Sequence, residues 1–179
     1  INDLLLAGPG IGKCASLQFL QKGRGVTNIT GEKLSEHQVI AAASQAFEKL
    51  GLAANGFIFL ADEESSRYEF LVEESNNFDL NVVANFTELL LKDLNSEYAD
   101  KRASGRLRSL VARRLNEGAI NAFKDQSVAR GVREAQYKPV ALDYSNNWKA
   151  KIAPWVDQVE QRTPAGAGDR SRARTSGIS

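Results

Sequence analysis

The order of strand and helix signals along residues 26–115 leaves few folds open to this chain. Runs of β-branched, aromatic and other apolar residues predict strands at 26–29, 57–62, 67–72 and 107–115. Apolar residues at helical spacing predict helices at 35–51 and 82–98. Strand, helix, strand, strand, helix, strand is the order of the split βαβ arrangement. We therefore expect an α+β protein with a ferredoxin-like, four-stranded sheet and helices packed on one face of it.

Local signals mark the boundaries of the first helix and of the two middle strands. Ser35 and Gln38 have the spacing of a capping box, and Gly51 is a typical C-terminal stop. Glu36 suits the positive N-terminal end of the helix dipole. The polar residues 63–66 predict a turn between the two middle strands, which would make these strands an antiparallel hairpin.

A short β-hairpin is expected ahead of this core, formed by residues 4–7 and 17–21. The glycine-rich segment at 8–14 has some features of a phosphate-binding loop. Its glycines are one residue too close together, however, and Cys14 stands where such a loop has a hydroxyl. A strand rather than a helix follows it. We therefore interpret the segment as a hairpin turn.

Extra helices are expected towards the C-terminal end. Residues 119–129 predict a helix that ends at Gly131, and residues 145–161 predict a last helix that is interrupted at Pro154. After residue 163 the chain is rich in Gly, Ala, Ser and Arg and lacks apolar runs. We therefore expect a disordered tail at 163–179.

Size and composition exclude several classes of protein. The 179 residues suit one domain, and a net charge of +1 gives no strong attraction to nucleic acid or membranes. No stretch approaches the roughly 20 apolar residues that a membrane helix needs. Cys14 is the only cysteine, which excludes an internal disulfide framework and favours a cytoplasmic location. The chain has no methionine and begins inside a strand-like run, so we expect a piece of a longer protein.

Few residues are candidates for chemistry. His37 is the only histidine and has no metal-ligating neighbours in sequence, so we expect no metal site and no His-based catalytic set. Gly31 and Lys33 lie in a loop between a strand and a capped helix, and Lys138 lies in a loop stiffened by Pro139. Such loops could offer an amide and cations to a phosphate or carboxylate, although each is equally typical of an ordinary surface loop.

A cluster of cations follows the second helix. Its members are Lys101, Arg102, Arg106, Arg108, Arg113 and Arg114. Nucleic-acid binding would require aromatic platforms or a recognised reader motif beside them, and the sequence shows neither. We therefore interpret the cluster as a solvated strand edge or a docking surface within the parent protein, and we do not expect nucleic acid as a partner.

Four segments together resemble one protein family. They are FLQKGRGVTNITGEKLSEHQV at 19–39, RYEFLVE at 67–73, EYADKRASGRL at 97–107 and RGVREAQYKP at 130–139. In order and spacing they resemble the C-terminal part of the auxin-responsive Gretchen Hagen promoter family, whose members are acyl-acid amidosynthetases related to other adenylate-forming enzymes. The resemblance covers about residues 1–142 and is closer to the bacterial members than to the plant ones.

The resemblance implies one part of a two-domain enzyme. In the family a large N-terminal domain binds ATP and a carboxylic acid, and a small C-terminal domain closes over them as a lid. An acyl-adenylate forms with release of pyrophosphate, and an amine or amino acid then attacks it. The implied cofactors are ATP and Mg²⁺, both bound mainly by the missing N-terminal domain, which is also the implied partner. The expected organisation is a hairpin and hinge at 1–25, the lid at 26–162 and the tail at 163–179, with no activity for the piece alone.

The resemblance also assigns roles to residues near the start of the chain. Asp3 corresponds to the family aspartate that holds the ribose hydroxyls of AMP, although Asn2 replaces the glycine usual before it. Either Lys22 or Arg24 corresponds to the cation at the domain junction.

Two further assignments concern the lid itself. Gly31 and Lys33 correspond to the loop that swings with the lid, and Lys138 corresponds to the lysine that reaches the adenylate.

Two alternatives remain beside the ligase. One is a stand-alone ferredoxin-like module that binds RNA or a protein partner without catalysis. The other is an inactive homologue whose lid serves as an interaction domain.

Overall fold

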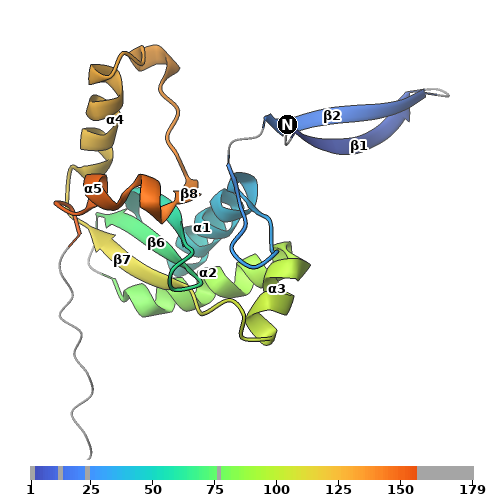
Figure 1. The fold of residues 1–179 in the computed structure, drawn as a ribbon, viewed down its shortest axis with the longest axis horizontal. Helices are drawn as coiled ribbons and strands as arrows, with labels where there is room; N and C mark the ends of the chain where they lie inside the picture. The colour runs from blue at the N-terminus through green and yellow to red at the C-terminus, as the bar shows by residue number, and fades with distance from the viewer. Residues whose placement is uncertain (1–2, 12–13, 23–24, 76–77, 157–179) are drawn as a thin grey trace, which may run out of the picture.

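The computed structural model describes residues 3–11, 14–22, 25–75 and 78–156 (Figure 1). It confirms the α+β class, with a separate β-hairpin, a four-stranded mixed sheet and helices packed on that sheet. The predicted tail at 163–179 lies outside the described residues. Within the described part of the chain, every helix is too short or too polar to span a lipid bilayer.

The central sheet has the strand order β7-β6-β5-β8. Its strands are β5 (Ala54–Asp62), β6 (Arg67–Glu74), β7 (Val111–Leu115) and β8 (Leu142–Tyr144). Strands β5 and β6 pair antiparallel around the predicted turn at 63–66, which confirms the hairpin. Strand β7 runs parallel to β6, and β8 runs parallel to β5.

The first predicted strand does not join this sheet. Strand β3 (Val26–Thr27) pairs antiparallel with β4 (Leu34–Ser35) in a ribbon of its own. The fourth strand of the central sheet is instead β8, which the sequence did not indicate. Strand β8 has three residues, too few to show the alternation by which a strand is recognised.

Helix α1 (Glu36–Leu50) forms as its end signals predict. The hydroxyl of Ser35 accepts a hydrogen bond from the backbone N–H of Gln38 at 3.3 Å, and the side chain of Gln38 accepts one from the N–H of Ser35 at 3.0 Å. Gly51 ends the helix in the left-handed conformation, with φ of 65°. The predicted capping box and glycine stop are both confirmed.

The single helix expected at 82–98 is in fact two helices, α2 (Leu80–Leu94) and α3 (Ser96–Ala103). Asn95 separates them because its backbone is extended, with φ of −144° and ψ of 103°. Its side-chain oxygen accepts a hydrogen bond from the N–H of Tyr98 at 2.9 Å, which caps the start of α3. The chain therefore turns a corner where the apolar pattern suggested a continuous helix.

The C-terminal part contains α4 (Ala119–Ala129), two 3₁₀ turns (Glu134–Gln136 and Ser145–Asn147) and α5 (Lys149–Ile152). The helix at 119–129 is confirmed. The last helix is shorter than predicted within the described residues, because α5 ends before Pro154, a residue with no backbone N–H to continue it.

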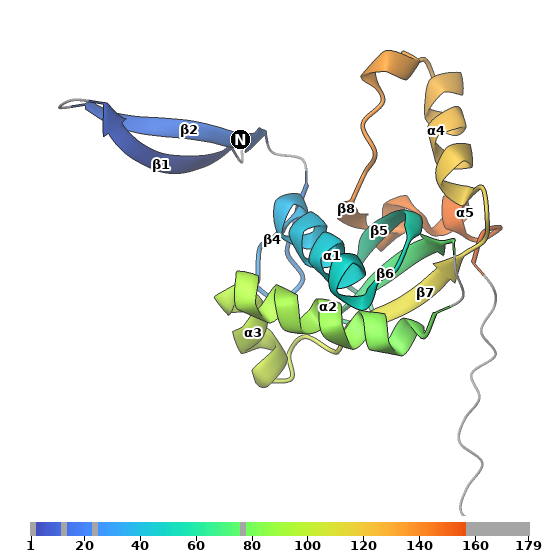
Figure 2. The same ribbon diagram turned by 180° about the vertical axis from the view of Figure 1, so that it is seen from behind.

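Helices cover both faces of the central sheet, so the expectation of one covered face is wrong (Figures 1 and 2). Helices α1 and α2 pack on the face that carries Phe59, Phe70 and Val72. Helices α4 and α5 pack on the opposite face, over Leu60 and Leu71. Successive residues of a strand point to opposite faces, and both sets are buried here. The sheet is therefore the middle layer of the domain.

The predicted N-terminal hairpin is confirmed as β1 (Asp3–Ile11) paired antiparallel with β2 (Cys14–Lys22). Most of the glycine-rich segment lies within β1, so the strand is longer than expected and the turn begins after Ile11. No helix follows this segment at Cys14, which agrees with its interpretation as part of a hairpin and not as a phosphate-binding loop.

Candidate functional site

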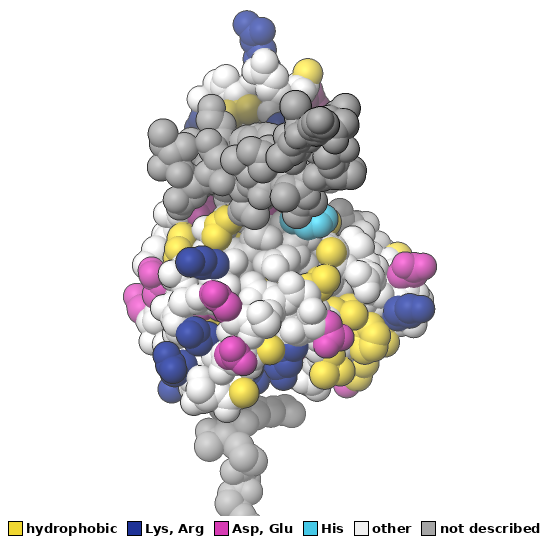
Figure 3. Space-filling view, turned by 90° about the vertical axis from the view of Figure 1, so that its right-hand side faces the viewer, with side chains coloured by type: hydrophobic (Ala, Val, Ile, Leu, Met, Phe, Trp, Pro, Cys, Tyr) yellow, Lys and Arg dark blue, Asp and Glu magenta, His cyan; other side chains and the backbone are white. Residues whose placement is uncertain are grey.

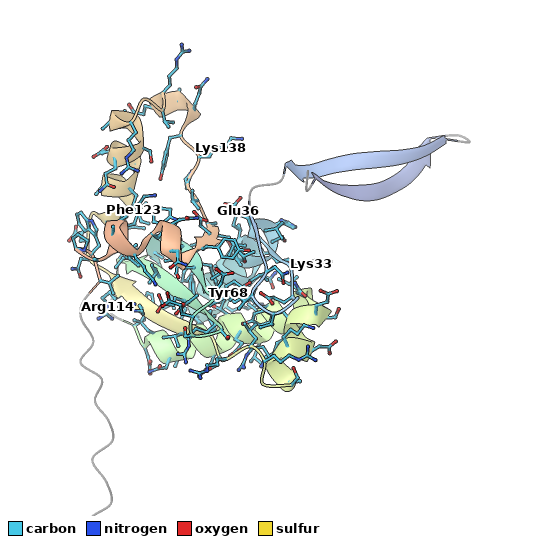
Figure 4. All side chains as sticks on the ribbon, in the orientation of Figure 1. Lys33, Glu36, Tyr68, Arg114, Phe123 and Lys138 are labelled. Atoms are coloured by element: carbon cyan, nitrogen blue, oxygen red, sulfur yellow. The ribbon has the colours of Figure 1, made fainter. Side chains whose placement is uncertain are left out.

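A polar pocket of about 580 Å³ lies where the start of the domain meets the segment that leads into β8. It is lined by Gly25, Val26, Thr27, Glu36, Lys138, Pro139, Val140, Leu142, Asp143, Tyr144 and Asn147. Lys138 is the only cation among these lining residues. Figure 4 shows Lys138 and Glu36 on the same side of the domain.

Hydrogen bonds between distant segments hold the floor of this pocket together. A carboxylate oxygen of Glu36, at the start of α1, accepts a bond from the N–H of Ala141 at 2.9 Å. The N–H of Glu36 donates to the carbonyl of Gly25 at 2.6 Å. The hydroxyl of Tyr144 accepts a bond from the N–H of Asn28 at 3.1 Å. The residues after the hairpin are thus tied to both α1 and β8.

The second carboxylate of the pocket, Asp143, is already engaged. It accepts hydrogen bonds of 2.8 Å from the N–H of Tyr144, the amide of Asn147 and the indole N–H of Trp148. These three bonds connect Asp143 to the residues that follow it, so Asp143 fixes the start of the turn after β8. Lys138, by contrast, has an exposed side chain at the rim. An exposed lysine beside a polar hollow can pair with a phosphate or carboxylate group of a ligand.

The Glu32 loop, residues 28–33, does not line this pocket. Its centre is Glu32, which is almost completely buried. The carboxylate accepts bonds from the N–H groups of Ile29 at 2.7 Å and Thr30 at 2.8 Å, and from the hydroxyl of Tyr68 at 2.5 Å. Burial alone would raise the pKa of Glu32, but these donors outweigh it and hold the pKa below its ordinary value of 4.5.

The same contacts fix the Glu32 loop to the core of the domain. The Tyr68 hydroxyl, on strand β6, also lies 3.0 Å from the hydroxyl of Thr27. Burial and the neighbouring charge of Glu32 raise the pKa of this phenol, so it remains a neutral donor. The amide of Asn95 donates to the backbone carbonyl of Glu32 at 3.0 Å. The loop is therefore held by β6 on one side and by the corner between α2 and α3 on the other.

The structure separates the residues that the resemblance grouped at one site. Lys138 lines the polar pocket, whereas Gly31 and Lys33 belong to the Glu32 loop. Figure 4 shows Lys33 away from Lys138. Gly31 has φ of 113°, and an added Cβ would lie 3.2 Å from Cε of Lys101. Lys33 is exposed.

The remaining predicted site residues belong to the N-terminal hairpin or lie beside it. Asp3 and Lys22 occupy opposite positions in the register of β1 and β2, so the hairpin brings their backbones together. Arg24 lies outside the described residues. The roles assigned to Asp3, Lys22, Arg24, Gly31, Lys33 and Lys138 therefore stay predictions.

The cation cluster after α2 is partly paired within the domain. Arg102 forms an ion pair with Glu88 and donates to the carbonyl of Leu107 at 2.6 Å. Arg113 pairs with Glu69 at 3.3 Å. On the face shown in Figure 3, basic and acidic side chains are interspersed. Arg102 and Arg113 of the cluster are thus engaged by acidic partners within the domain.

The described residues fit the implied cofactors only in part. Among them, no group of three His, Cys, Asp or Glu side chains is placed to hold a metal ion. For ATP, the polar pocket offers Lys138 as a partner for one phosphate or carboxylate group. Which residues bind ATP stays a prediction.

The family is established by comparison with known proteins. Residues 37–145, more than half of the chain, match the GH3 family C-terminal domain. This chain therefore belongs to the GH3 family and contains its C-terminal domain. GH3 is the Gretchen Hagen promoter family that the four sequence segments indicated. The closer likeness to bacterial members stays a prediction.

Two solved structures show the same fold. One is a GH3.15 acyl acid amido synthetase, with 18% identity and a TM-score of 0.67, matched over 87% of this chain and 31% of that one. The other is AtGH3.15 acyl acid amido synthetase in complex with 2,4-DB, with 17% identity and a TM-score of 0.65, over 86% and 29%. This chain thus spans less than a third of the length of either protein. None of the curated protein sequences matches it.

Proposed function

We propose that this chain is the C-terminal lid of an ATP-dependent ligase that joins a carboxylic acid to an amine or amino acid. Membership of the GH3 family supports this class of activity. The observation that carries the proposal is the position of Lys138. It is the one cation lining a polar pocket of about 580 Å³ beside the start of the domain. A lid can deliver charge only from a surface that faces its partner, and Lys138 is exposed there.

In this proposal the substrates and most of the cofactor are held by a large N-terminal domain, and ATP supplies the group that activates the acid. Lys138 places a positive charge against a phosphoryl or carboxylate oxygen when the lid closes. Asp3 would hold the ribose, and Lys22 or Arg24 would act at the hinge. Gly31 and Lys33 would contribute an amide and a second cation from the fixed Glu32 loop.

The proposal also includes an organisation for the chain. Residues 1–25 would form the hairpin and hinge that continue from the large domain, residues 26–162 the lid, and residues 163–179 a tail outside it. The parent enzyme would work in the cytoplasm, with its own N-terminal domain as the partner of this lid. Such a lid contains too little of the nucleotide site to catalyse the reaction alone.

Exchange of pyrophosphate into ATP, dependent on a carboxylic acid, tests this function. In the enzyme that contains this domain, Lys138→Ala should lower kcat/KM at least about 100-fold, because a charge aimed at the transition state is lost. Lys138→Arg should retain part of the activity, and Lys49→Ala, which removes an exposed lysine at the end of α1, should retain all of it. Unchanged activity in Lys138→Ala, or exchange by the isolated 179 residues, would contradict the proposal.

A further inference from the structure

A second pocket, of about 390 Å³, lies between α1, β5, α4 and the arch, which we define as residues 131–140 between α4 and β8. Its lining consists of Ile40, Asn55, Gly56, Phe57, Ile58, Ile120, Phe123, Tyr137, Pro139, Val140, Ala141 and Trp148. None of these residues carries a charge. We call this hollow the apolar pocket. The activity proposed above makes no use of it.

The walls of the apolar pocket are suited to a flat hydrocarbon. Phe57 of β5, Phe123 of α4, Tyr137 of the arch and Trp148 before α5 contribute aromatic rings from four different parts of the fold. The rings of Phe123 and Trp148 pack edge to face, with centroids 5.2 Å apart, so this wall is already ordered. A volume of about 390 Å³ falls within the range of pockets that hold small organic ligands.

Most polar groups at the edge of the pocket are already engaged within the domain. The amide of Asn55 donates to Glu73 at 3.3 Å and accepts from the hydroxyl of Ser75 at 2.8 Å. The indole N–H of Trp148 donates to Asp143. Burial raises the pKa of Tyr137, so its phenol is neutral and can donate or accept one hydrogen bond. A charged ligand group inside would therefore lack a partner of opposite charge.

We propose that the apolar pocket binds a neutral molecule, or a neutral part of one, that contains a single six-membered ring. The uncharged aromatic lining selects against ionised groups, and the phenol of Tyr137 offers one polar contact. Pro139 and Val140 line both this pocket and the polar pocket of Lys138. A ring bound here therefore contacts the arch directly and holds Lys138 near its position at the rim.

Isoleucine methyl groups provide a direct test with the whole 179-residue chain. Ile40, Ile58 and Ile120 line the apolar pocket, whereas Ile29 and Ile152 do not. Titration of methyl-labelled protein with para-cresol should shift the NMR signals of the three isoleucines that line the pocket. The signals of Ile29 and Ile152 should stay in place. Para-toluate and para-methylbenzylammonium have the same ring with a negative and a positive charge. Each should bind at least about tenfold more weakly than para-cresol, because its charge is unpaired.

A pair of surface variants separates the pocket from general surface effects. Ile40 is 42% exposed at the pocket, and Val82 is 49% exposed on α2 and does not line it. Ile40→Lys should weaken para-cresol binding at least about tenfold, because it places a positive charge at the pocket without a partner of opposite charge. Val82→Lys adds the same charge elsewhere and should leave the affinity unchanged.

Three outcomes would overturn the inference. The first is the absence of methyl shifts with para-cresol, and the second is stronger binding of either charged compound. The third is a change in the same methyl signals on dilution of the chain alone, which would show that a second copy occupies the pocket. None of these measurements involves ATP or catalysis, so the ligase proposal and this inference can fail separately.

Discussion

The Glu32 loop and the arch carry the predicted cations Lys33 and Lys138, and the two segments are built in opposite ways. The loop is centred on a buried carboxylate with donors from its own backbone and from Tyr68 on β6. In the arch, every residue from 131 to 136 is exposed. Its main polar contact is the ion pair of Lys124 with Glu134, 2.7 Å long and on the surface.

This difference bears on how each cation could act. A buried carboxylate that satisfies several donors is costly to displace, so Lys33 is expected to move only with the whole domain. Segments with few buried contacts open at low free-energy cost, and the arch is such a segment. Lys138 can therefore change position while the rest of the domain remains folded.

The largest expected effect is that of Glu32→Ala. The change leaves the N–H groups of Ile29 and Thr30 and the hydroxyl of Tyr68 without their acceptor. We expect the free energy of unfolding to fall by about 3 kcal/mol, because buried donors would lose a charged partner. Urea unfolding measures this. Glu134→Ala, which removes the exposed carboxylate of the arch, is the matched control and should leave the midpoint unchanged.

A smaller effect is expected at the start of α4, the helix that precedes the arch. Gly118 at the start of this helix has no side chain to cap it, and the buried Glu73 of β6 accepts from the N–H groups of Gly118 at 3.1 Å and Ile120 at 2.8 Å instead. Glu73→Gln should cost about 1–2 kcal/mol, since an amide is a weaker acceptor for a helix N-terminus. Amide hydrogen exchange should accelerate in α4 and not in α1. Equal acceleration in both helices would show that Glu73 supports the whole core.

Local signals explain which elements the sequence could predict. The capping box of Ser35 with Gln38 and the stop at Gly51 lie within a few residues of what they control, and both formed as predicted. The break at Asn95 was missed because apolar residues continue at helical spacing on both sides, while an Asn can either sit within a helix or cap the next one.

The candidate site depends on contacts between distant residues, which the sequence could not predict. The importance of Glu32 depends on Tyr68 and Asn95, which lie 36 and 63 residues away in sequence. The role of Glu36 depends on Ala141, 105 residues away. A single sequence without aligned relatives contains no signal for such contacts. The loop around Lys138 made this residue one candidate among several, the family resemblance gave it a predicted role, and its placement at a pocket came only from the structure.

Acid should weaken the Glu32 loop below pH 4.5. The folded-state pKa of Glu32 is held below 4.5. As the pH falls, the unfolded chain therefore takes up a proton at Glu32 at a higher pH than the folded chain does. The stability that Glu32 contributes is therefore complete above pH 4.5 and is lost as the pH falls through the folded pKa. The loss should be smaller than in Glu32→Ala, because a protonated carboxyl still accepts hydrogen bonds. Urea unfolding of the wild type and Glu32→Gln below pH 4.5 should show a steeper decline for the wild type.

The smallest expected effect is that of Lys124→Ala, which removes the ion pair between α4 and the arch. Both side chains are solvent-exposed, so the pair competes with water and salt and should add nothing measurable to global stability. Its loss should appear only locally, as faster amide exchange at 132–137 and a higher protease sensitivity of the arch. The Glu32 loop should keep its protection, since the bonds that hold it come from Ile29, Thr30 and Tyr68. A shifted urea midpoint would mean that the arch unfolds together with the core. Lys138 would then be as firmly held as Lys33, and the contrast between the two segments would be wrong.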